Sequence, residues 1–322
     1  MYFPIADIEI SPWIPPIVAF VISFFTSMGG VSGAFLILPF QVSVLGFSTP
    51  AVSATNQLFN IVAIPSGVYR YIKEGRMVWP LTWAVIIGTL PGVIIGAILR
   101  VQYLPNPKNF KVFASLVLLY IAGRLMKDLL MKKQSSGPQM PAEEQFHKTV
   151  KKTYESNESN GHGDTSGQRQ IPRITVKKFD MSRIIYEFYG RRFDINAMGI
   201  MMLSFSVGII GGIYGIGGGA IIAPFFVSFF GLPVYTVAGA ALMGTFITSV
   251  VGVLFYQVIA PFYPDIAVAP DWALGLLFGL GGFAGMYCGA SLQKFVPARL
   301  IKLILIFCIL FPAINYIMVF FR

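Results

Sequence analysis

Long apolar stretches recur along this chain and constrain its fold more than any other feature. A helix needs about 20 apolar residues to cross a hydrocarbon core, and most of the stretches approach or exceed that length. Only 12% of the residues are charged, against roughly a quarter in soluble domains. The apolar stretches are residues 13–46, 50–69, 79–99, 110–123, 195–231, 234–256, 272–293 and 303–321. The sequence predicts an all-α integral membrane protein with about 8–10 transmembrane segments.

The net charge of +10 would suit a nucleic-acid partner, but its distribution favours another interpretation. Basic residues gather in loops and in a central hydrophilic stretch, as the positive-inside rule expects of cytoplasmic segments. We therefore expect a lipid bilayer as a partner, no nucleic acid, and a multi-pass location in a prokaryotic inner membrane or a plasma membrane. Homo-oligomer formation stays open. The N-terminus has no basic region followed by a cleavage site, so no signal peptide is expected.

The inventory of reactive side chains points away from catalysis. His147 and His162 lie in the polar stretch, and Cys288 and Cys308 are isolated within apolar segments. Such cysteines are typical packing residues, and no CxxC spacing suggests a metal. No His, Asp and Glu constellation lies at membrane depth. We expect no metal, no cofactor and no enzyme activity.

Residues 132–193 separate two hydrophobic halves, residues 1–131 and 194–322. The first part of this insert is rich in Ser, Gly, Asn, Glu and Lys, a composition typical of disordered linkers. Its later part, "IPRITVKKFDMSRIIYEFYGRR", mixes basic with aromatic residues. That part fits a segment on an anionic membrane surface, or equally a solvated linker with some local order. We expect the insert to be cytoplasmic.

The two halves repeat each other. At an offset of 185, "GVSGAFLILPFQVSVLG" (30–46) matches "GIGGGAIIAPFFVSFFG" (215–231), with Pro39 on Pro224. Downstream, residues 51–60 fall opposite 236–245, and "PGVIIGAIL" (91–99) resembles "GMYCGASLQ" (285–293). Internal duplication is typical of secondary transporters, whose site lies between the repeats. Duplication for packing alone is the alternative.

Charge placement favours an inverted second half. The opening segment of each half is too long for one crossing and too short for two, so we expect it to break at its glycines into a helical hairpin. A hairpin gives each half an odd net number of crossings. The basic loop 70–76, the insert and the loop 294–302 would then be cytoplasmic, and Asp265 and Asp271 external. The exceptions are Arg100, Lys108 and Lys111.

The glycine cluster at 211–219 admits three interpretations. "GIGGGA" fits a dinucleotide fingerprint, but no acidic residue follows before Asp265. Repeated G-x-x-x-G spacings favour close helix packing, which is the better explanation for Gly92/Gly96, Gly275/Gly279 and Gly285/Gly289. Consecutive glycines at 217–219 instead suit a broken helix, which is tolerated at membrane depth only when it is buried or lines a cavity. A helix that restarts after the break offers free N–H groups and a positive dipole end to an anion.

These elements together resemble the sulfite exporter TauE/SafE family. The resemblance rests on "GIGGGAIIAP" in the second half, "GVSGAFLILP" in the first, the loop "YRYIKEGRMVW" (69–79) and "PGVIIGAIL". It covers both hydrophobic halves but not the insert. The first half departs from the pattern, with Ser32 and Ala34 where the family usually has glycine. The resemblance implies transport of small anions such as sulfite, sulfonates and other sulfur oxyanions.

An anion site in this chain would have to use uncharged groups. No Asp, Glu, Lys or Arg lies near the middle of a predicted span, and Arg70, Arg100 and Arg124 fall at span ends, where snorkelling to the interface is expected. Asn56 and Asn60 are four residues apart and share a helix face. Interhelical hydrogen bonding is the alternative role for such residues. The candidate substrate-binding residues are Gly30, Ser32, Gly33, Asn56, Gln57, Asn60, Gly217, Gly218, Gly219, Thr245 and Thr248.

We expect a secondary transporter that moves a small sulfur-containing anion, such as sulfite, thiosulfate or a sulfonate like sulfoacetate, by alternating access between the repeats. The chain has no G-x-x-x-x-G-K-[ST] loop, so an ion gradient or the membrane potential would drive it. The alternatives are an anion channel, and a non-transporting scaffold that docks a partner through residues 132–193.

Overall fold

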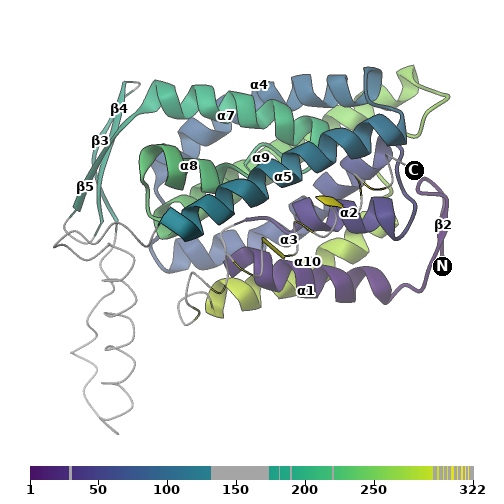
Figure 1. Cartoon of the computed structure of the whole chain (residues 1–322), viewed down its shortest axis with the longest axis horizontal. Helices are drawn as coiled ribbons and strands as arrows, with labels where there is room; N and C mark the ends of the chain where they lie inside the picture. Colours follow the sequence, from purple (N-terminus) through teal and green to yellow (C-terminus); the bar gives the residue numbers. More distant parts are fainter. Residues whose placement is uncertain are drawn as a thin grey trace, which may run out of the picture.

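A computed structural model of the chain shows helices that run side by side along the long axis of the molecule (Figure 1). It describes residues 1–28, 31–131, 174–180, 182–188, 191–219 and 221–292, and single residues between 296 and 318. The predicted disordered part of the insert lies outside these residues.

The first half opens with a small hairpin and then five helices. A pair of short antiparallel strands precedes a helix that breaks before residue 34, and three long helices follow. The elements are β1 (Tyr2–Phe3), β2 (Ile8–Glu9), α1 (Ile14–Met28), α2 (Ala34–Ser43), α3 (Ala51–Lys73), α4 (Trp79–Gln102) and α5 (Pro107–Met131).

The second half has the same order of helices after a three-stranded sheet. Its first helix also stops at the glycine cluster and restarts as a short one. The elements are β3 (Thr175–Phe179), β4 (Arg183–Phe188), β5 (Arg191–Asn196), α7 (Ala197–Tyr214), α8 (Ile222–Phe230), α9 (Val234–Ile259), the 3₁₀ turn η1 (Ala260–Phe262) and α10 (Trp272–Leu292). The predicted glycine-broken hairpins are thus α1–α2 and α7–α8.

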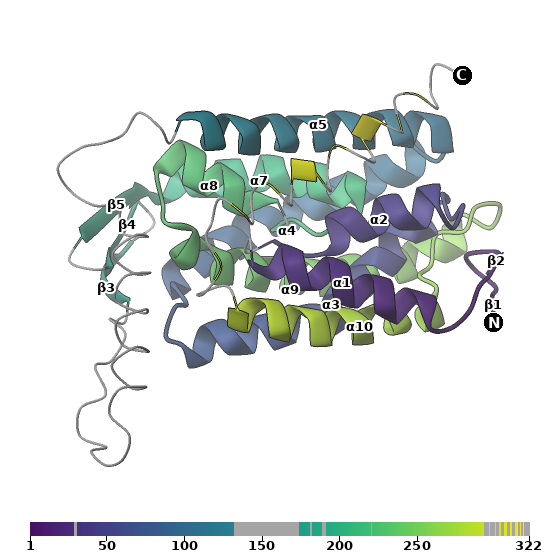
Figure 2. The ribbon, with the colours of Figure 1, turned by 60° about the horizontal axis from the view of Figure 1, so that its bottom comes forward.

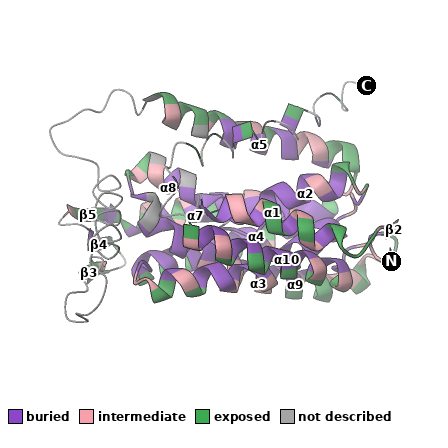
Figure 3. Cartoon of the chain, turned by 90° about the horizontal axis from the view of Figure 1, so that it is seen from below, coloured by how far each residue is buried: buried purple, intermediate pink, exposed green. Residues whose placement is uncertain are grey.

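The chain is an all-α membrane protein apart from these few strands. Among the described residues, four helices are long and apolar enough to cross a bilayer, at Trp79–Gln102, Ala197–Tyr214, Thr236–Phe262 and Trp272–Leu292. Buried residues face the interior of the bundle, and exposed ones lie on its outer surface (Figure 3). Large apolar side chains such as Leu116, Leu254 and Leu280 are exposed there, as expected of helix faces that contact lipid.

Glycines bring the two halves into close contact. A side chain on Gly92 of α4 would begin 2.5 Å from the Phe205 carbonyl oxygen of α7, and one on Gly285 of α10 would collide with the backbone of α1 at Phe20. This confirms close packing at the G-x-x-x-G spacings.

The two hairpins share hydrogen bonds at equivalent positions. The amide of Val31 donates to the Thr26 carbonyl at 3.2 Å, and 185 residues later the amide of Ile216 donates to Gly211 at 3.0 Å. At the end of the restarting helices, Phe47 N–H bonds to Gln41 O at 3.0 Å, and Leu232 N–H bonds to Phe226 O at 3.4 Å. In each half this turn contains a glycine with positive φ, Gly46 at 75° and Gly231 at 64°. Such backbone geometry ends a helix and favours glycine.

The later part of the insert forms an antiparallel sheet in the order β3-β4-β5. Ile184, Ile185, Tyr186 and Phe188 of β4 are buried, and the Tyr186 hydroxyl lies 3.0 Å from the Thr236 hydroxyl of α9. The segment is therefore an ordered cap on the end of the bundle. Neither of the two sequence interpretations, a membrane-surface segment or a solvated linker with some local order, anticipated a packed sheet.

The loops divide between the two ends of the bundle. Gly239 near the start of α9 packs against Tyr71 and Met77, so the loop after α3 lies at the same end as the sheet. At the opposite end, the amide of Ala51 bonds to the Ala267 carbonyl at 2.9 Å, and the Asp271 carboxylate accepts from Ala6. Figure 1 shows β1–β2 and β3–β5 at these opposite ends.

Candidate functional site

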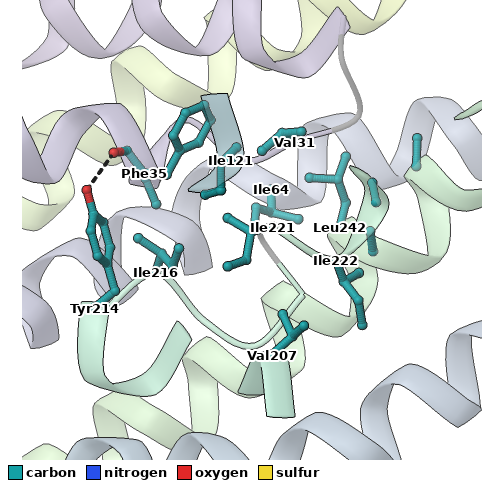
Figure 4. Packing of buried hydrophobic residues seen from close by; sticks show 14 of the residues in the cluster. Val31, Phe35, Ile64, Ile121, Val207, Tyr214, Ile216, Ile221, Ile222 and Leu242 are labelled. Carbon is teal, nitrogen blue, oxygen red and sulfur yellow. Dashed lines mark hydrogen bonds between the residues drawn. The ribbon is translucent and has the colours of Figure 1, made fainter. Parts of the chain in front are cut away.

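The two helix breaks meet in the middle of the bundle. The described residues of the second break, 215–219 and 221, lie beside the start of α2, where the Tyr214 hydroxyl donates to the Phe35 carbonyl at 3.2 Å (Figure 4). Ile216, Ile221 and Ile222 pack here among buried apolar side chains. Figure 2 shows α2 and α8 extending away from this region toward opposite ends. The first break includes Gly30, which lies outside the described residues, so its predicted role stays a prediction.

The sequence of the second break explains its path. Gly215 and Gly217 have φ of 80° and 78°, a conformation that favours glycine. A side chain at Gly215 would occupy the space of Ser53 on α3, and one at Gly217 would begin 2.8 Å from the Ser249 hydroxyl. Glycines therefore let the chain turn and also let it approach α3 and α9.

Asn56 of α3 contacts both breaks. Its Nδ2 donates to the Ala34 carbonyl at 3.0 Å and to the Gly215 carbonyl at 3.1 Å. The side chain is buried, and its Oδ1 has no hydrogen-bond partner. One carboxamide thus links the restarting helix of the first half to the break of the second.

Asn60 lies one turn further along α3 on the same face. Its Nδ2 donates to the Ile216 carbonyl at 2.9 Å and to the Ser249 hydroxyl at 3.2 Å. Its Oδ1 accepts a hydrogen bond from the Ser32 hydroxyl. The carboxamide donors of Asn56 and Asn60 are therefore engaged in this conformation.

The restarting helices direct their N-termini to the same region. Ala34 N–H donates to Ser32 Oγ at 3.2 Å, and Gly218 N–H donates to Thr248 Oγ1 at 3.0 Å. The first N–H groups of a helix lack partners within it, and the helix dipole is positive there. Side-chain hydroxyls of this chain thus accept from the first amide of α2 and from the Gly218 amide in the break before α8.

Several predicted residues lie around this centre without pointing a free group into it. Thr245 donates to the Ala241 carbonyl of its own helix at 2.8 Å, and Gly219 packs against it. Gly218 lies against Thr89 of α4, and Gly33 against Ser23 of α1. These glycines are sites of close contact between elements.

Gln57 faces α9 beside Gly252, and neither end of its buried carboxamide has a partner. Ser53 was missed by the sequence interpretation, although it lies one turn before Asn56. Its buried hydroxyl is also without a partner. The spacing of Ser53, Asn56, Gln57 and Asn60 places all four on one face of a helix, and this spacing was the signal that could have identified Ser53.

The candidate site is polar but uncharged. Among the described residues, the buried charged side chains are Arg76, Arg100 and Asp271, and none lies at the breaks. No group of three metal-ligating side chains occurs in the described part of the chain. Unpartnered buried amide and hydroxyl groups in this setting cost free energy, and they are suited to hydrogen bonding with a small anion.

One expectation for the charged residues was wrong. Arg100 does not snorkel to the surface, because its side chain is 0% exposed. Its guanidinium turns inward to backbone carbonyls at Leu104 and Ser48. The loops around α4 enclose it, and apolar periodicity alone gives no indication of this.

Comparison with protein families gives one match. A family model described as "Sulfite exporter TauE/SafE" matches residues 16–316. Comparison with curated proteins and with solved structures found no match. The matched residues include both helix breaks and the polar face of α3.

Proposed function

This chain belongs to the sulfite exporter TauE/SafE family of membrane transporters, and on that premise we propose that it is a secondary transporter of a small sulfur-containing anion. The substrate class is sulfite, thiosulfate or a sulfonate such as sulfoacetate. It would bind beside the two breaks, where helix N-termini and the Ser53 hydroxyl supply uncharged donors.

The observation that carries the proposal is the double contact of Asn56. Asn56 bonds to the restarting helix of one half and to the break of the other. Relative movement of the two halves would therefore change or break these hydrogen bonds. In transporters built from repeats, substrate sites lie at the repeat interface, and one repeat rocks against the other. We infer alternating access at this position.

An inverted repeat would give the two halves opposite orientations. The paired hydrogen bonds at an offset of 185 residues support a duplication. The loop after α3 and the loop after α9 lie at opposite ends of the bundle, which supports inversion. Basic residues of the loop after α3 lie at the end that carries the sheet, so this end would be cytoplasmic by the positive-inside rule. The insert would then also be cytoplasmic.

Counterflow in proteoliposomes tests the function. Vesicles loaded with unlabelled sulfite should accumulate labelled sulfite above its external concentration, because an alternating-access carrier exchanges the two. An anion channel would only equilibrate the label. A scaffold that only docks a partner would show no sulfite flux. If the protein is a transporter, a variant without residues 132–173 should still transport sulfite.

A further inference from the structure

Arg100 carries a buried positive charge that the described part of the protein does not neutralise with a carboxylate. Its guanidinium donates to the Leu104 carbonyl and, at 3.2 Å, to the Ser48 carbonyl. It also lies 3.8 Å from the centre of the Phe110 ring. The ion pairs between described residues do not include Arg100, and its Nε has no partner. A buried cation that is held only by carbonyl oxygens and an aromatic ring, without a carboxylate, is energetically costly.

The Tyr256 hydroxyl lies close to this charge, and the Ser53 hydroxyl lies beside Tyr256. Tyr256 of α9 is fully buried and packs with Ala97 and Val101, which flank Arg100 on α4. The Tyr256 hydroxyl lies near that of Ser53 and on the side of α9 that faces Arg100. No well-aligned hydrogen bond joins either hydroxyl to another group, and both residues are 0% exposed.

These groups continue the polar face of α3 from the breaks toward one end of the bundle. Ser53 packs against Gly215 of the second break, and Asn56 follows one turn deeper. In the other direction, the Ser48 carbonyl just before α3 contacts Arg100. Polar groups of α3 and of the turn before it therefore extend from the breaks to the guanidinium.

We propose that Arg100, Tyr256 and Ser53 form a second anion subsite, through which the substrate passes between the breaks and the end of the bundle that carries the loop after α9. The subsite rests on the proposed transport function and adds to it a cationic contact. A planar guanidinium matches the oxygens of a sulfite or sulfonate group, and the two hydroxyls donate to the same oxygens. The role also explains why Arg100 departs from the positive-inside distribution.

A purely structural role makes a different prediction. Arg100 ties the turn before α3, at Ser48, to the loop after α4, at Leu104. If that clamp were its only role, its replacement would lower stability and leave the affinity for anions unchanged.

The test measures sulfite binding to the full-length protein in detergent by calorimetry, with thermal unfolding recorded in parallel. Arg100→Gln should weaken sulfite binding about tenfold or more, as expected for loss of a charge-assisted hydrogen bond. Arg100→Lys should retain part of the affinity. Arg124→Gln is the matched control, because Arg124 also lies over an aromatic ring, 4.7 Å from the centre of Phe229, but on the peripheral helix α5. It should bind sulfite like the wild type.

Tyr256→Phe and Ser53→Ala each remove one hydroxyl with little change in packing, and each should weaken binding about threefold to tenfold. They decide the question if Arg100→Gln does not fold. Wild-type affinity in Arg100→Gln, or in both hydroxyl variants when Arg100→Gln is unfolded, overturns the subsite and leaves the transport function standing. If the wild-type protein neither binds nor transports sulfite, thiosulfate or sulfoacetate, the transport function fails, and the subsite with it.

Discussion

The side-chain amide of Asn56 lies 3.1 Å from the carbonyl oxygen of Gly215, although 159 positions separate the two residues. The same nitrogen lies 3.0 Å from the Ala34 carbonyl oxygen. Gly215 follows the last residue of α7, so its carbonyl has no donor within that helix. The Ala34 carbonyl belongs to the first turn of α2. Asn56 thus satisfies a buried carbonyl at the break of one half and is joined to the restarting helix of the other.

Replacement of Asn56 by leucine should reduce both sulfite counterflow and stability. The buried Gly215 carbonyl, beyond the end of α7, would lose its donor, at a cost of about 1–3 kcal/mol, and the Ala34 carbonyl would lose a second donor. Leucine itself favours insertion into the membrane, so the variant should still reach the membrane. Counterflow in proteoliposomes and thermal unfolding in detergent measure the two effects.

Gln102→Leu is the control for this change. Gln102 also donates a carboxamide hydrogen bond, to the Tyr263 hydroxyl at 3.3 Å, but at an exposed position. Its loss should alter neither flux nor stability by a measurable amount. If flux and unfolding temperature are unchanged in Asn56→Leu, the contact of Asn56 with both breaks contributes neither to transport nor to stability.

Gly218→Ala should destabilise the protein. The new Cβ would lie 2.5 Å from the Thr89 Cβ on α4, so α4 or the break would have to shift, at about 1–3 kcal/mol. Gly123→Ala should instead leave stability unchanged or raise it by up to about 1 kcal/mol, because alanine favours a helix interior and nothing lies within 4 Å of the added methyl group. Thermal unfolding of the two purified variants gives the comparison. Equal unfolding temperatures would contradict the close packing at Gly218.

The sequence predicted the broken hairpins because glycine clusters within apolar segments have few physical uses. In the structure, the break contains Gly215 and Gly217, which have positive φ. Asn56 and Asn60 contact this break. Gln57 was grouped with them by position, but the rotation of α3 turns it toward Gly252. Which neighbour a polar side chain meets depends on helix packing, and single-sequence spacing does not determine it.

Arg100 and the sheet were missed for a similar reason. Proximity to a span end predicted an exposed guanidinium, but the neighbouring loops enclose it. The alternation of Ile184, Tyr186 and Phe188 was a strand signal, yet the basic composition of the segment favoured other interpretations. Its burial depends on contact with α9, which local sequence does not reveal.

Thr248→Val should lower stability because one buried backbone amide loses its hydrogen-bond acceptor. Gly218 N–H donates to Thr248 Oγ1 at 3.0 Å, and valine keeps the shape of the side chain but offers no acceptor. The buried amide would lose its partner, at about 1–3 kcal/mol. Thr82→Val is the control, since the Thr82 hydroxyl donates to the Val78 carbonyl of the preceding turn at 3.0 Å. Thermal unfolding should separate the two variants. Identical values would mean that another group satisfies the Gly218 amide.

The orientation of the bundle is tested by cysteine labelling from the two sides of the membrane. Lys178 on β3 and Asp265 after α9 are exposed and belong to opposite ends of the bundle. The background has Cys288 and Cys308 replaced by serine. In it, Lys178→Cys should react with a membrane-impermeant maleimide only after the cells are permeabilised. Asp265→Cys should react in intact cells. This follows because the Lys178 end also carries Arg70, Lys73 and Arg76, and basic loops are retained in the cytoplasm.

Reaction of Lys178→Cys in intact cells, with protection of Asp265→Cys, would reverse the orientation. Labelling of both positions from one side would contradict the inverted arrangement of the two halves.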